Sequence, residues 1–181
     1  MILKFFVILS LLFVQNIYAN TILKIDEKTE LIWSLKNSKT NIIIKKKGDI
    51  PKRVKVTEDF GTESSALPDK IKLIALVKET AIIIMYTYEA HGKEIESNES
   101  ENETFLRIIS IANKQPKEVY KVRTQSKFDK IELQEVNGIL WNKKNSTLQI
   151  NWHYAPVTHR EDEIVIQIKK DGELKIFRVL G

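Results

Sequence analysis

The strongest hydrophobic signal in the chain is the run Ala81–Tyr88, AIIIMYTY, which carries no charge on either parity. A strand with one exposed face alternates apolar and polar residues, whereas a run that is apolar on both parities is buried on both faces. Its short length and its Ile, Tyr and Thr content favour a strand over a helix. We therefore expect a central strand covered on both sides. The apolar run Ile71–Val77 precedes it, and the polar residues Lys78–Thr80 between them predict a β-hairpin.

Short alternating or apolar runs continue along the rest of the chain, separated by polar turn residues, and none has a helical period of useful length. The further expected strands are 22–25, 30–35, 41–47, 53–56, 105–111, 118–123, 128–135, 139–141, 147–154, 164–168 and 174–180. Asn137-Gly138 is a turn signal, and Asp171-Gly172 is a strong hairpin signal. About a dozen short strands at this spacing predict an all-β antiparallel meander.

Two segments of the meander repeat. Residues 74–88 align with 140–154 at an offset of 66, and residues 105–122 align with 162–179 at an offset of 57. A weaker third copy begins at Trp33–Ser38, which aligns with Trp141–Ser146. Each unit has four antiparallel strands, as in a propeller blade, but two or three units are too few to close a propeller. Stacked sheets of a sandwich, a barrel and an incomplete propeller all remain open, and so does chance similarity of two meanders.

The first residues have the form of a secretory signal peptide. Lys4 is followed by the apolar run Phe5–Val14 and by Ala19 at a plausible cleavage point. That run is too short to span a bilayer, which takes about 20 residues. We expect a signal peptide over 1–19, a single all-β domain over 20–181 without a transmembrane segment, and a possible subdomain junction in the polar stretch 57–69. This places the chain in the periplasm or outside the cell.

The amino-acid composition excludes several kinds of catalytic and structural chemistry for this chain. The chain has 181 residues and no cysteine, so disulfides and thiol catalysis are excluded, and a cysteine-free exported chain rich in Lys, Ile and Asn suggests a bacterial periplasm. It has no Gly-X-Ser-X-Gly motif and no phosphate-binding glycine loop. A metal site could be imagined at His153, His159 and Asp162, but their spacing matches no known pattern. Tyr86, Tyr88, Trp152 and Tyr154 share one parity within their strands, which favours a buried face over a sugar-binding platform. We expect a non-enzyme without a cofactor.

Two charged surfaces remain as candidates for binding. The net charge is +5, and the loss of Lys4 with the signal peptide leaves +4 from 28 basic and 24 acidic residues. The expected basic surface comprises Lys45, Lys46, Lys47, Lys52, Arg53 and Lys55. The expected acidic loop comprises Glu94, Glu96, Glu99, Glu101 and Glu103. Both have a simpler interpretation, because lysines protect edge strands and acidic loops are commonly only solvated.

Three hypotheses of function follow. The first is an exported non-enzymatic binding protein that engages another macromolecule, of which an inhibitor or an immunity protein is a specific form. The second is an envelope-associated protein that binds an anionic glycan or lipid through the basic surface. No aromatic residues are interleaved with those lysines, which argues against nucleic acid. The third is a hydrolase whose site is assembled from distant loops, for which the sequence offers no positive support.

Overall fold

The computed structural model describes residues 20–36, 39–56, 66–88, 103–128, 132–155 and 159–180, which form three antiparallel sheets. Sheet A contains β1 (Asn20–Lys24), β2 (Thr29–Lys36), β3 (Lys39–Lys46) and β4 (Lys52–Arg53) in that order. Sheet B contains β5 (Lys70–Val77), β6 (Ala81–Tyr88), β7 (Glu103–Ser110) and β8 (Lys117–Arg123). Sheet C contains β9 (Gln125–Phe128), β10 (Glu132–Asn142), β11 (Thr147–Ala155), β12 (Glu161–Ile168) and β13 (Leu174–Leu180), with β9 and β13 at its edges. The prediction of an all-β antiparallel meander is confirmed.

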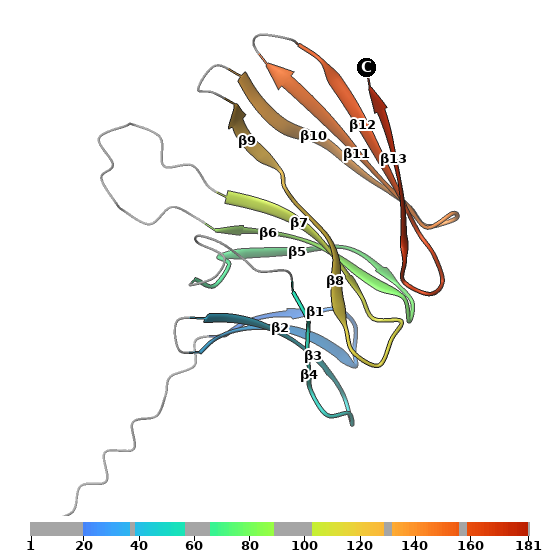
Figure 1. The fold of residues 1–181 in the computed structure, drawn as a ribbon. Coiled ribbons are helices and arrows are strands. Elements are labelled where there is room, and N and C mark those ends of the chain that lie inside the picture. The colour runs from blue at the N-terminus through green and yellow to red at the C-terminus, as the bar shows by residue number, and fades with distance from the viewer. Residues whose placement is uncertain are drawn as a thin grey trace, which may run out of the picture.

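The three sheets are stacked as layers, with sheet B between sheets A and C (Figure 1). Two separate hydrophobic cores fill the stack. The core between sheets A and B is centred on Leu31, Trp33 and Ile82, and the core between sheets B and C is centred on Ile83, Leu106 and Ile150. The sheets do not close into a barrel. Of the three arrangements that the sequence left open, the barrel does not form, and the sandwich and the incomplete propeller both agree with three stacked antiparallel sheets.

β6 lies at the centre of this arrangement. Its even-numbered side chains, such as Ile82 and Ile84, belong to the core with sheet A, whereas Ala81 and Ile83 belong to the core with sheet C. All four are fully buried. Burying one such aliphatic side chain stabilises a fold by about 1.5–3 kcal/mol, and β6 makes this contribution on both faces. The prediction of a central strand covered on both sides is confirmed, as is its hairpin with β5.

The internal repeat holds at the level of strands for sheets B and C. An offset of 66 carries β6 onto β11, and an offset of 57 carries β8 onto β13. The proposed third copy, however, is displaced by one strand. It aligned Trp33 of β2 with Trp141 of β10, but β2 is the second strand of its sheet and β10 is the first of its four-stranded unit. The positional equivalent of β2 is β11, because each is the second strand of its four-stranded unit.

The predicted turn at Asn137-Gly138 is wrong. These residues lie inside the single long strand β10, where the register against β11 shifts between Val136 and Gly138. This β-bulge lets Val136 and Ile139 both face the core, which regular alternation at a spacing of three would forbid. The predicted strand 128–135 is divided between β9 and β10, and the predicted strand 53–56 is reduced to the two-residue β4. The hairpin signal at Asp171-Gly172 is confirmed, with Gly172 at φ +79°.

Several expectations lie outside the described residues. The signal peptide over 1–19 is one, and residues 57–65 of the expected junction are another. Residues 66–69 are described and lead into β5. No helix in the described part of the chain is long and apolar enough to cross a membrane.

Candidate functional site

The six residues of the expected basic surface do not converge on one face. Lys45 and Arg53 lie on the outer face of sheet A. Each is paired with a residue of the neighbouring strand whose side chain points away from the core. Lys46 and Lys52 lie one position away on the other parity, near the turn that joins β3 to β4. Lys55 continues past β4 and pairs through its backbone with β8. The charges are therefore divided between two surfaces.

Carboxylates are interleaved with these basic residues. Lys45 Nζ lies 3.9 Å from Glu30 Oε2 on the neighbouring strand. Asp26 and Glu27 line the same open hollow as Lys45 and Lys47. The Oδ1 atom of Asp26 accepts a hydrogen bond of 2.8 Å from the Lys28 backbone N–H, which lowers the pKa of this carboxyl. This arrangement of both signs does not form a concentrated anion-binding site.

Of the expected acidic loop, only Glu103 is described. It begins β7 and its Oε1 lies 3.3 Å from Arg123 Nη2, so this carboxylate is paired within sheet B. Glu94, Glu96, Glu99 and Glu101 lie outside the described residues. The hypothesis that the loop binds a partner therefore stays a prediction.

The imagined metal site is not assembled. The rings of His153 and His159 lie 6.3 Å apart, but Asp162 is on the opposite parity of sheet C and faces the core. In the described ranges, no group of three or more His, Asp or Glu side chains is placed to hold a metal ion. Tyr86, Tyr88, Trp152 and Tyr154 are buried, as expected for core aromatics, and they divide between the two cores.

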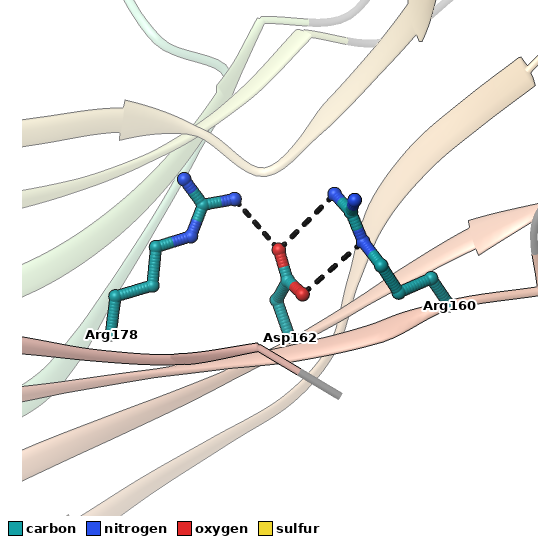
Figure 2. A network of polar contacts seen from close by, with 3 residues as sticks. All are labelled: Arg160, Asp162 and Arg178. Carbon is teal, nitrogen blue, oxygen red and sulfur yellow. Dashed lines mark hydrogen bonds and ion pairs between the residues drawn. The ribbon is translucent and has the colours of Figure 1, made fainter.

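Asp162 is instead held by two arginines, as Figure 2 shows. Its Oδ2 accepts a hydrogen bond of 2.7 Å from Arg178 Nη2, and its Oδ1 lies 3.3 Å from Arg160 Nε. The Asp162 side chain is 1% exposed, whereas the arginines are about half exposed at 54% and 43%. This carboxylate raises the pKa of Arg178 by hydrogen bonding and by its charge. The cluster joins β12 to β13 and the residues before β12, and we interpret it as structural.

The feature that the sequence analysis missed is a row of apolar side chains on each outer face of the stack. On sheet A, cross-strand partners Ile22, Ile32 and Ile43 form a row that ends at Arg53. On sheet C, the row runs through Leu140, Gln149, Val165 and Phe177. Residues directly opposite in neighbouring strands point to the same side, so each row lies on one face of its sheet. The sheet A row is apolar up to Arg53, whereas Gln149 interrupts the apolar residues of the sheet C row.

The ends of these rows are open to solvent, whereas Ile32, Ile43 and Val165 within them are half-buried. Ile22 is 55% exposed, Leu140 is 59% exposed and Phe177 is 42% exposed. Val179, which follows Phe177 on the same parity of β13, is 55% exposed. Scattered exposed apolar residues are ordinary on a protein surface, but contiguous ones mark contact sites. A signal was present in the sequence: Ile42-Ile43-Ile44 is apolar on both parities, as β6 is, yet only one side of β3 is covered.

Comparisons of the chain with protein-family models, with curated proteins and with solved structures found no match. The functional argument therefore depends on the chain's own residues.

Proposed function

We propose that this chain is a non-enzymatic protein that binds another protein through the outer face of sheet C. The observation that carries the proposal is the apolar surface of half-buried Val165 and exposed Phe177 and Val179 on the neighbouring strands β12 and β13, with Leu140 exposed two strands away on β10. Aromatic residues at the centre of an apolar patch contribute much of the binding energy in protein interfaces. We also propose that binding takes place in the periplasm or outside the cell, which the signal-peptide pattern of residues 1–19 supports.

The alternative of an anionic glycan or lipid on the basic surface has less support. Its six residues occupy two surfaces and are interleaved with Asp26, Glu27 and Glu30. Binding of a polyanion to such a surface would depend strongly on salt, because the contacts are exposed. Binding through an apolar patch would persist at high salt, which separates the two ideas experimentally.

The test is affinity capture from an envelope extract at low and at high salt, with the wild-type protein and two variants. Phe177→Lys places a cation at the aromatic residue of the sheet C patch, and Lys46→Glu alters the basic surface. We expect a stoichiometric protein partner that survives high salt, is lost with Phe177→Lys and is retained with Lys46→Glu. Capture that is lost with Lys46→Glu and with salt, but not with Phe177→Lys, would overturn the proposal in favour of the anionic partner.

A further inference from the structure

We infer that the protein bound by sheet C is a second copy of this chain, which presents the outer face of its sheet A. The inference rests on the proposed function and names the partner of the same surface. Within one chain, sheets A, B and C already stack in a fixed order through apolar faces. Contact of sheet C with sheet A of the next copy continues that order, so the two open ends of the stack cover each other.

The rows of the two faces correspond strand by strand, and Gln149, the one polar residue of the sheet C row, falls opposite Ile32 of the next copy. β1 lies against β5 inside the chain, so the first strands of sheets A and B share one edge of the stack. Continuation of this order places β10, β11, β12 and β13 on β1, β2, β3 and β4 of the next copy. Leu140 then meets Ile22 of the next copy, and Val165 meets Ile43. Phe177 meets Arg53, and a guanidinium on an aromatic face is a favourable pair.

Charge favours this pairing over contact between two like faces. The outward positions of sheet A carry Lys24, Lys36, Lys39, Lys45 and Arg53 against Glu30. The outward positions of β12 and β13 carry Glu161 and Glu163 against Lys175. Two A faces together would therefore bring ten basic residues into contact, and like charges in an interface cost several kcal/mol. In the continued stack, β3 of the next copy lies on β12. Lys39 at the start of that β3 is then near Glu161 and Glu163 at the start of β12.

Geometry favours a closed pair over an open chain of copies. A head-to-tail interface produces a ring when the rotation closes. Two copies supply six sheets, which lies within the four to eight blades of closed propellers. A face of four strands is about 19 Å wide and about 26 Å long, or about 500 Å² in plan. One such contact is smaller than the roughly 800 Å² that each partner contributes to a stable interface, whereas a closed pair uses two faces of each copy.

The test is sedimentation velocity over a wide range of concentrations, with variants that damage one face each. Phe177→Lys places a cation on the sheet C face, and Ile22→Lys does so on the sheet A face. Asn113→Lys makes the same charge change in the exposed turn between β7 and β8 of the middle sheet, outside the strands of sheets A and C. We expect the wild-type protein and Asn113→Lys to dimerise, and each face variant to dissociate at least tenfold more readily. Circular dichroism of every variant confirms that it is folded.

Mixing the two face variants distinguishes the orientation. An equimolar mixture of Phe177→Lys and Ile22→Lys restores one intact interface, so we expect mixed pairs of affinity between that of the wild type and that of either variant alone. If Ile22→Lys dimerises as well as the wild type, contact between two C faces is the correct arrangement and the inference is overturned. A wild-type protein that stays monomeric up to about 1 mM, where even a weak complex of Kd near that value forms, also overturns it.

The outcomes separate this inference from the proposed function. A monomeric wild-type protein that captures a different protein, with loss of capture in Phe177→Lys, removes the second copy and leaves protein binding by sheet C intact. A monomeric protein whose capture does not depend on Phe177 removes both.

Discussion

The ion pair between Arg107 of β7 and Glu118 of β8 offers the sharpest test of the packing between sheets A and B. Arg107 Nε lies 2.7 Å from Glu118 Oε2, and each side chain is 2% exposed. The guanidinium also lies over the Tyr86 ring, 5.1 Å from its centroid. Both charges have therefore left water, and each contributes to the compensation of the other.

Removal of one partner should be far more damaging than removal of both. Glu118→Leu leaves the buried cation without its carboxylate, and breaking a buried pair in this way costs about 3–5 kcal/mol. A domain of this kind is stable by about 5–15 kcal/mol in total, so the single variant loses a large part of its stability. The double variant Arg107→Met with Glu118→Leu replaces both charges by apolar groups, and such replacements are neutral or stabilising.

Thermal unfolding followed by tryptophan fluorescence measures these differences. We expect a melting temperature lower by about 6–20 °C for Glu118→Leu, and near the wild-type value for the double variant. Glu173→Gln is the matched control, because Glu173 pairs with Lys169 at 3.2 Å but is 67% exposed, and exposed pairs contribute under about 1 kcal/mol. If Glu118→Leu were no more damaging than this control, the reasoning from burial would be refuted.

Three further predictions test other parts of the structure. Gly172→Ala should lower the free energy of unfolding in urea by about 2 kcal/mol or more, because φ is +79° and an added methyl would collide with Ser110 Oγ. The double variant with Ser110→Ala should recover part of this loss, and an unchanged unfolding midpoint for Gly172→Ala would contradict the prediction. Ile82→Ala should cost about 2–5 kcal/mol by chemical unfolding, whereas Ile22→Ala on the outer face of the monomer should stay within about 0.5 kcal/mol. An NMR titration should show the pKa of the Asp26 carboxyl below its usual value of 3.8. Its contribution to stability is therefore present above pH 3.8 and is lost as the pH falls through the lowered pKa. A titration midpoint above 3.8 would contradict the effect of the hydrogen bond from Lys28.

The order and type of the strands could be predicted from sequence because local periodicity carries that information. β6 was identified by apolar residues on both parities, and the Asp171-Gly172 hairpin by its turn chemistry. The failure at Asn137-Gly138 has a tertiary cause. The dipeptide is compatible with a turn and with a bulge, and the core decides between them because Val136 and Ile139 must both face sheet B. No local pattern contains that requirement.

The candidate surfaces were harder to predict, because a cluster in sequence need not be a cluster in space. Lys45 and Lys46 are adjacent in the chain, yet they point to opposite faces of sheet A because side chains alternate along a strand. Conversely, Leu140, Val165 and Phe177 lie far apart in sequence, and only the strand register places them in one row. Register depends on pairings across the whole sheet, so single-sequence patterns could predict that Phe177 alternates but not what lies beside it.

The difference between the inner and outer faces of the sheets indicates that two copies associate after each has folded. The faces within the chain present mainly apolar side chains, such as the fully buried Ile83, Leu106 and Ile150, and the buried charges of Arg107, Glu118 and Asp162 are paired among them. The outer faces have one apolar row bordered by polar residues, and Gln149 interrupts the row on sheet C. An obligate interface resembles a core cut in half, and these faces do not. The chain can therefore complete both cores alone, and pairing of copies becomes a separate equilibrium between folded proteins. The monomer–dimer equilibrium should therefore change with protein concentration. The unfolding of each stack should stay cooperative, because neither core contains a residue from the other copy.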